Sequence, residues 1–477
     1  MSIKRSIWLS AAVAGGALAS VLPLPVVVFG GSALLFILLI AITPLAALTV
    51  LVVLAPLRTL IATEAAIQLP LDIGQLILLA FLSAVFVHGF VLRRKRLHVD
   101  WNPLYIPLII MLVATGLSAF PAQSMSAWLS EWLKWLQMLV LVGVVMILLP
   151  ARRWQWLIFA LVLAGVANAA IGLYEFVGGS GALHLLINDR FFRAFGTFGQ
   201  PNPFGGFMGL LAPLSLLMML AYGRRWWITR QQADFLAFMF YAIGSFALLG
   251  GIVISWSRGA WLGLVASLTV VMMALPRKTG YGIGLALLVL GVGALLWFGN
   301  LLPASIVARI SSSTAEFFAF EDVRAIDITP ENYPVAERLA HWQAALNMAR
   351  SNPWLGVGFG NYEVAYPAHR LINWDEPLGH AHNYYLNMFA EGGIIGLAGY
   401  GTAWLLIAWF TWKVRRHPDM LSRVAAIGLL GSWIYLAVHS LFDNLYVNNL
   451  FLHLGLMLGI LGVLYNQISS YVSMRSS

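Results

Sequence analysis

Residues 235–275 read FLAFMFYAIGSFALLGGIVISWSRGAWLGLVASLTVVMMAL, and Arg258 is the one charged residue among them. A helix needs about 20 apolar residues to cross the hydrocarbon core of a bilayer, with ~17 as the lower limit. The stretch therefore predicts two membrane spans, near 235–256 and 260–275, joined by a tight turn at Ser257-Arg258-Gly259. A cation at such a turn is costly and usually functional, although an arginine that extends from a helix end to the membrane surface needs no function.

The whole chain has the composition of this stretch. Of its 477 residues, 60% are hydrophobic and only 10% are charged, whereas soluble domains carry ~25% charged residues. We therefore predict an all-α integral membrane protein, a polytopic helical bundle of about 14 spans, within a range of about 12–14. The sequence has no cysteine, which excludes disulfides, thiolate nucleophiles and metal sites with cysteine ligands.

Apolar segments of span length recur along the chain. The run 7–57 has breaks near Pro23 and Pro44 and predicts three spans. We expect them to be retained, because the run continues almost unbroken to Pro56 and lacks the short core of a cleaved signal peptide. The remaining spans are predicted near 71–91, 103–120, 133–150, 154–176, 202–222, 235–256, 260–275, 281–300, 384–411, 422–440 and 447–467.

The distribution of charge predicts the orientation. With both termini on the cytoplasmic side, the cytoplasmic segments contain 18 of the 28 basic residues and three acidic ones, Asp100, Asp234 and Asp419. Cytoplasmic loops of membrane proteins carry such an excess of lysine and arginine. The net charge of +9 is thus mainly a feature of topology, and we expect a multi-pass protein of the bacterial cytoplasmic (inner) membrane with no nucleic-acid partner.

The long polar segment 301–383 then lies outside the membrane. Within it, 337–348 has an amphipathic helical pattern, and Asn352-Pro353-Trp354 ends that pattern. We predict an outward-facing helical lid on the outer membrane surface. The chain divides into the N-terminal part of the transmembrane bundle at 1–300, the extracytoplasmic loop or lid at 301–383, and the C-terminal part of the bundle at 384–477.

Three arginines fall at or near the outer face. Arg193 precedes a span, Arg258 lies in the tight turn described above, and Arg338 lies in the predicted lid helix. A guanidinium group matches the geometry of phosphate with two parallel hydrogen bonds. Arginines that converge on a cavity at the outer membrane surface therefore predict a pyrophosphate or lipid-phosphate site.

Two histidines lie just before the span at 384–411, in the segment His380-Ala381-His382-Asn383. An imidazole titrates near neutrality and can act as a general base toward a hydroxyl. The alternative for His382 is a histidine that only caps the helix. His380, His382 and His341 could also bind zinc, but His380 and His382 are two residues apart and the sequence has no H-E-x-x-H motif, so we expect no metal.

These residues lie in motifs that resemble the O-antigen ligase and polymerase superfamily of bacterial membrane glycosyltransferases. The motifs occur in order between about 190 and 400: Arg193-x-x-Gly196-Thr197 with Pro201-Asn202; Ser257-Arg258-Gly259; Arg338-x-x-x-Trp342; Asn352-Pro353-Trp354-Leu355-Gly356-Val357-Gly358; and His382-Asn383-x-x-Leu386-x-x-x-x-Glu391-x-Gly393. Each motif is weak alone, and five in order on one face are fairly specific.

The resemblance implies transfer of a glycan from an undecaprenyl-pyrophosphate donor to an acceptor hydroxyl at the outer face of the cytoplasmic membrane, in lipopolysaccharide or related polysaccharide biosynthesis. It implies a catalytic role for His382 and donor binding by Arg193 and Arg258, with no metal or other cofactor. Arg338, Asn383 and His380 are expected to support substrate binding. Attack opposite the departing pyrophosphate would invert the anomeric centre.

Two alternatives remain open at this point. A repeat-unit polymerase of O-antigen or exopolysaccharide uses the same donor and differs from a ligase only in its acceptor, which is a lipid, glycan or protein hydroxyl for a ligase. A transporter or flippase of lipid-linked sugar is the alternative from another class. Transporters often place ionisable residues at the midplane of broken helices, whereas the charged candidates here cluster around the lid, which favours an enzyme.

Overall fold

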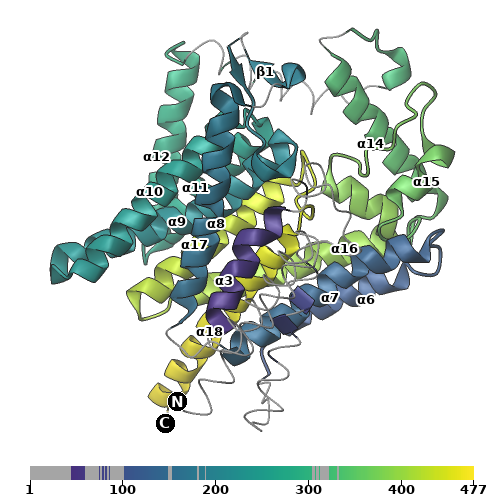
Figure 1. Cartoon of the computed structure of the whole chain (residues 1–477). Helices are drawn as coiled ribbons and strands as arrows, with labels where there is room; N and C mark the ends of the chain where they lie inside the picture. Colours follow the sequence, from purple (N-terminus) through teal and green to yellow (C-terminus); the bar gives the residue numbers. More distant parts are fainter. Residues whose placement is uncertain are drawn as a thin grey trace, which may run out of the picture.

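The fold is described from a computed structural model, which places residues 44–57, 101–148, 153–179, 182–187, 190–302, 322–329 and 332–476, with isolated positions between 59 and 85 and at 307 and 311. Nearly all regular structure there is helical (Figure 1). The helices are α3 (Pro44–Leu54), α6 (Tyr105–Leu117), α7 (Met125–Leu148), α8 (Trp154–Tyr174), α9 (Pro201–Thr229), α10 (Gln232–Ile254), α11 (Arg258–Ala274), α12 (Thr279–Phe298), α14 (Tyr333–Ser351), α15 (Tyr362–His369), α16 (Tyr384–Val414), α17 (Met420–His439) and α18 (Leu450–Ser476).

The prediction of an all-α, multi-pass membrane protein is confirmed. Eight of the described helices are long and apolar enough to cross a membrane, and every span predicted between 103 and 467 coincides with a helix. Two helices outside those eight, α6 and α11, also fall on predicted spans but have only 13 and 17 residues. Most of 7–57 and 71–91 lies outside the described residues, so the total number of spans stays a prediction, although α3 does begin at Pro44, one of the predicted breaks.

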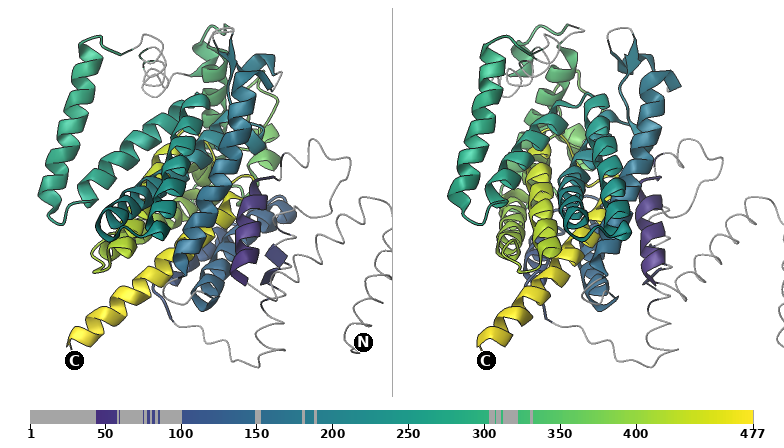
Figure 2. Two further views of the ribbon diagram at one scale, coloured as in Figure 1. Left: turned by 60° about the vertical axis from the view of Figure 1, so that its left-hand side comes forward. Right: turned by 90° about the vertical axis from the view of Figure 1, so that its left-hand side faces the viewer.

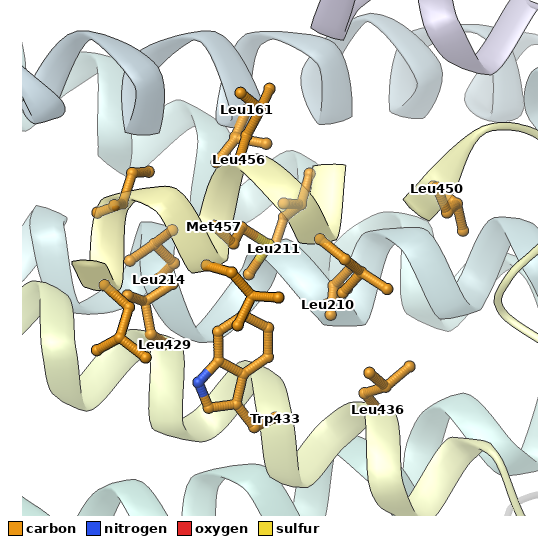
Figure 3. Packing of buried hydrophobic residues seen from close by; sticks show 14 of the residues in the cluster. Leu161, Leu210, Leu211, Leu214, Leu429, Trp433, Leu436, Leu450, Leu456 and Met457 are labelled. Atoms are coloured by element: carbon orange, nitrogen blue, oxygen red, sulfur yellow. The ribbon is translucent and has the colours of Figure 1, made fainter. Parts of the chain in front are cut away.

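The centre of the bundle consists of α9, α17 and α18. Figure 3 shows Leu210, Leu211 and Leu214 of α9 beside Trp433 of α17 and Met457 of α18, and all five are buried. Small residues let these helices approach closely. A Cβ atom on Gly209 would lie 1.9 Å from the Tyr435 ring, and the Tyr435 hydroxyl donates a hydrogen bond to the Gly205 carbonyl at 2.8 Å.

In contrast, α12 lies at the edge of the bundle. It packs mainly against α11, and both views of Figure 2 show it as the outermost helix on its side. Its apolar side chains are largely exposed, among them Leu287, Leu295 and Phe298. Because the helix is apolar all round, the surface that it presents suits lipid tails.

The lid helices α14 and α15 lie at one end of the bundle, beside the N-terminal end of α16 (Figure 1). The helix predicted over 337–348 is confirmed as α14, which ends at Ser351, directly before the Asn352-Pro353-Trp354 motif. The buried face of α14 includes Leu339, Trp342 and Ala345.

The loop after α14 joins α16 where that helix is interrupted. Gly393 has φ +61, and the backbone N–H of Ile394 donates to the Pro353 carbonyl at 2.8 Å. One turn earlier, the Val357 N–H donates to the Ala390 carbonyl at 2.9 Å. A Cβ atom on Gly393 would lie 2.3 Å from the backbone of Trp354. The glycine-rich motifs thus fix the lid to the helix that begins just after His382.

Candidate active site

His380 and His382 both lie next to a buried carboxylate, Asp443. His380 Nε2 and His382 Nδ1 are each 3.6 Å from Asp443 Oδ1. Asp443 lies in the segment between α17 and α18 and is 2% exposed. Its Oδ1 accepts a hydrogen bond from the Asn444 N–H at 2.8 Å, and its Oδ2 has no hydrogen-bond partner among the described residues. A carboxylate so deeply buried is costly unless polar groups compensate for it, and the two imidazoles and the Asn444 N–H are placed against it.

The local backbone determines which nitrogen of His380 faces Asp443. The backbone N–H of His382 donates to His380 Nδ1 at 3.0 Å. In the neutral imidazole the nitrogen that accepts lacks a proton and the other nitrogen carries one, so His380 Nε2–H points toward Asp443. His382 itself has φ +52, a conformation that is uncommon for residues other than glycine and is typical of functional sites.

Asn383 caps α16. Its side-chain oxygen accepts hydrogen bonds from the backbone N–H groups of Tyr385 and Leu386 at 3.0 and 3.1 Å, as expected for an N-cap asparagine. The next residue, Tyr384, donates its N–H to the Ser440 carbonyl at 2.8 Å. The cap thereby fixes His382 at the start of α16 and ties that start to the end of α17, close to Asp443. The role of Asn383 in substrate binding stays a prediction.

Burial and neighbouring charges set the protonation of this group. Burial lowers the pKa of His380 to about 4, and the charges of His382 and Arg338 act in the same direction, while Asp443 opposes them. Burial alone would raise the pKa of Asp443, but its interaction with His382 and the nearby imidazoles of His380 and His439 hold that pKa well below the usual range. Asp443 is therefore ionised and His380 neutral near pH 7.

Two lid residues face the same histidines. The ring centroid of His341 lies 6.0 Å from that of His382, and His341 Nδ1 is 3.0 Å from the Tyr362 hydroxyl. Burial, followed by the charges of His382 and His380, lowers the pKa of His341 to about 4. Arg338 lies on the same helix, α14, and contributes to the lowered pKa of His380. The lid thus brings one buried imidazole and one guanidinium toward the histidine pair.

Arg193 follows a short hairpin of β1 (Leu186–Ile187) and β2 (Phe191–Phe192). Its Nε donates to the Ser255 carbonyl at 3.1 Å, and a terminal nitrogen donates to Asn202 Oδ1 at 3.3 Å. The backbone just after Arg193 is also held in place, because Glu175 accepts hydrogen bonds from the N–H groups of Phe195 and Gly196 at 2.8 and 2.7 Å. The arginine is therefore fixed between the start of α9 and the end of α10.

Arg258 is the first residue of α11 and is half-buried. It lies three residues after Ser255, whose carbonyl Arg193 binds. A Cβ atom on the next residue, Gly259, would lie 2.8 Å from Cβ of Phe442, the residue before Asp443. Two of the predicted arginines therefore flank the α10–α11 turn, and that turn packs against the segment that contains Asp443.

The zinc alternative can be examined against this geometry. Among the described residues, the group that could hold a metal ion is His380, His382 and Asp443, whose ligand atoms all lie within 4.8 Å of one another. This group differs from the predicted set by replacing His341 with Asp443. A metal at His380 Nε2 would need that nitrogen deprotonated, whereas the hydrogen bond at Nδ1 favours the Nε2–H form. The arrangement therefore suits two imidazoles packed against an ionised carboxylate better than a metal centre.

Sequence reasoning did not identify Asp443 or His439. Both are buried, His439 as the last residue of α17 and Asp443 in the segment that follows, and the histidines that Asp443 faces are about 60 residues earlier in the chain. One pattern could have identified them, namely a histidine and an aspartate at the predicted outer end of an apolar span. Burial of such residues costs free energy, and they commonly mark functional positions.

Two comparisons with known proteins bear on the family. A family model described as O-antigen ligase matches residues 243–401. An O-antigen ligase from Pseudomonas aeruginosa is 32% identical over 178 residues, which make up 37% of this chain and 36% of that protein. The resemblance to the O-antigen ligase superfamily is confirmed. The range matched by the O-antigen ligase model includes Arg258, Arg338 and the His380–Asn383 segment, whereas Arg193 and Asp443 lie outside it.

Proposed function

We propose that this protein transfers a glycan from an undecaprenyl-pyrophosphate donor to an acceptor hydroxyl at the outer face of the bacterial cytoplasmic membrane, as an O-antigen ligase does. The observation that carries the proposal is the pair of histidines against the buried Asp443, each 3.6 Å from its Oδ1, next to the turn that carries Arg258. Both termini would lie in the cytoplasm, in keeping with the distribution of basic residues.

His382 is the general base in this proposal. With its Nδ1 directed at Asp443, its Nε2 is the nitrogen that accepts the proton of the acceptor hydroxyl. Asp443 then stabilises the imidazolium that forms, as a buried carboxylate does in other histidine-dependent enzymes. His380 Nε2 lies 3.6 Å from the same oxygen and helps to position the carboxylate. Neutral His380 and ionised Asp443 suit these roles.

Arg193 and Arg258 bind the donor pyrophosphate. The bond between the anomeric carbon and the phosphate oxygen breaks while the acceptor oxygen bonds to that carbon from the opposite side, which inverts the centre. Undecaprenyl pyrophosphate leaves with the bonding electrons. Guanidinium groups fixed before the reaction stabilise this growing charge without reorganisation, so no metal is required. The exposed apolar helices offer a surface for the polyprenyl tail.

The test is a reconstituted reaction with product identification. Purified protein would be incubated with undecaprenyl-pyrophosphate-linked oligosaccharide and an acceptor such as lipid A-core, and products would be identified by mass spectrometry. We expect glycosylated acceptor in the presence of EDTA and none with His382→Ala. Polymerised donor without acceptor modification would indicate the polymerase activity instead, and donor movement across vesicles without any new glycosidic bond would indicate a transporter.

A further inference from the structure

A second group of charged side chains lies at the end of the bundle opposite the lid, where the α11–α12 and α16–α17 turns meet. A terminal nitrogen of Arg415 donates to the Thr279 hydroxyl at 3.1 Å, and Arg423 donates to the Leu275 carbonyl. Both bonds join the α16–α17 turn to the α11–α12 turn. The views in Figure 2 show the two turns at the same end of the molecule.

This group is strongly cationic. We define the arginine group as Arg277, Arg415, Arg416 and Arg423. Within the part of the chain that the structure describes, none of these four has a carboxylate within ion-pair distance. The nearest acid along the chain, Asp419, instead caps α17 by accepting from the Ser422 N–H at 2.8 Å. Among the described residues, the four positive charges thus have no ion-pair partner, and the two adjoining turns contain a single acid, Asp419.

Arg415 distinguishes this group from arginines that only determine the orientation of a protein in the membrane. Its side chain is 3% exposed, and its Nε has no hydrogen-bond partner among the described residues. The guanidinium stacks over the Trp412 ring at 3.8 Å. Burial, and then the charges of Arg416 and Arg423, lower its pKa. An excess of basic residues in a cytoplasmic loop requires neither burial nor mutual proximity, whereas a buried cation with an unused donor is costly and suggests a ligand.

We propose that the arginine group binds the phosphate of an anionic phospholipid headgroup. Guanidinium groups bind phosphate with paired hydrogen bonds, and basic pockets between membrane helices bind anionic lipid headgroups. The neighbouring helix α12 supports a lipid over a soluble anion, because its exposed apolar surface begins directly at this turn, with Tyr281 71% exposed. The site lies at the opposite end from His382 and is independent of the proposed transfer reaction.

The experiment measures lipid retention by the full-length protein in detergent. Native mass spectrometry would compare binding of dioleoylphosphatidylglycerol with that of dioleoylphosphatidylcholine in the parent protein and in the double variant Arg277→Gln/Arg416→Gln. Both substituted side chains are exposed, so the fold should persist, and an unchanged elution volume would verify this. Each basic residue near an anionic headgroup contributes roughly fivefold in affinity. We therefore expect the parent to prefer phosphatidylglycerol and the double variant to lose roughly 25-fold in its affinity.

Arg153→Gln is the matched control, because Arg153 is an exposed arginine at the start of α8 and lies in another loop of the same predicted face. It should retain the preference. Equal loss in this control, or no preference in the parent, would overturn the proposal. Thermal unfolding with inorganic phosphate and with glycerol 3-phosphate separates the ligand sources. Stabilisation by these soluble anions equal to that by phosphatidylglycerol would also overturn it, in favour of a soluble phosphate ligand.

Discussion

The two ends of the helix bundle hold their charges in different ways. At the lid end, His380 and His382 each lie 3.6 Å from the buried Asp443, so that groups that can gain or lose a proton face a buried anion. At the opposite end, the arginine group has no carboxylate within ion-pair distance among the described residues. Arginine stays protonated at any physiological pH, whereas histidine titrates near neutrality.

This difference separates binding from chemistry. A permanently charged group can hold an anion but cannot transfer a proton, which suits the far end to a structural lipid. Proton transfer requires an imidazole close to a fixed anion, and His382 Nδ1 lies 3.6 Å from Asp443 Oδ1. We therefore expect the two ends to differ in their exposure to the outside, in catalysis and in their response to pH.

The largest expected effect concerns the sides of the membrane. The chain has no cysteine, so single cysteines can report exposure. Ile372 in the lid segment is 88% exposed, and Lys278 lies in the exposed turn at the other end. Ile372→Cys should react with a membrane-impermeant maleimide in intact spheroplasts, and Lys278→Cys should react only after permeabilisation. The reverse pattern would contradict the orientation from which the outer active site was inferred.

The next largest effect is expected at His382. General-base catalysis contributes about 10²–10⁴ in rate, so His382→Ala should lower kcat by roughly a thousandfold. Donor binding should persist because the arginines hold the pyrophosphate, and this can be measured by co-purification of labelled donor. A variant that turns over normally would remove His382 from the mechanism. A variant that fails only in donor binding would make His382 a pyrophosphate ligand instead.

A smaller loss is expected when an arginine at the lid end is replaced by lysine. Arg258→Lys keeps the charge but loses the planar fork that binds phosphate with two parallel bonds. Loss of one such contact to a developing charge costs ~3 kcal/mol, or about a hundredfold in kcat/KM. Arg350→Lys, at the exposed C-terminal end of α14, is the matched control and should retain full activity. Full activity of Arg258→Lys would show that a point charge is sufficient.

The sequence predicted more of the fold than of the site. Each span predicted between 103 and 467 from apolar length alone falls on a helix. The bilayer imposes both the helical structure and the length of such segments. The interruption of α16 at Gly393 depends on hydrogen bonds to Pro353 and Trp354, about 40 residues away, and no local pattern encodes it. Asp443 could not be found from the sequence for the same reason, since its position beside the two histidines depends on packing between the end of α17 and the start of α16.

Asp443 provides a test of that packing. Asp443→Asn keeps the shape of the side chain but removes the charge that stabilises the imidazolium of His382. An opposite charge at this distance contributes at least one pKa unit, so kcat should fall by about tenfold, while KM for the donor stays the same. Asp443→Glu should restore part of the rate if the charge is what matters. A Glu variant no better than the Asn variant would indicate a purely structural role.

The smallest effect is a pH dependence of stability that should arise at the lid end. Burial lowers the pKa values of His380 and His341 from 6.5 to about 4, so between these values the unfolded chain binds more protons than the folded protein. Stability should therefore be fully present above pH ~6.5 and fall as the pH is lowered toward 4. The unfolding temperature in detergent, measured from pH 7.5 to 5, should decrease accordingly.

His341→Gln removes one titrating group and can still bond to the Tyr362 hydroxyl, which His341 approaches at 3.0 Å. The variant should show a shallower decrease than the parent, whatever its stability at pH 7.5. If the unfolding temperature of the variant fell with pH as steeply as that of the parent, His341 would not be buried as a neutral imidazole. The lid end would then differ less from the permanently charged far end in its response to pH.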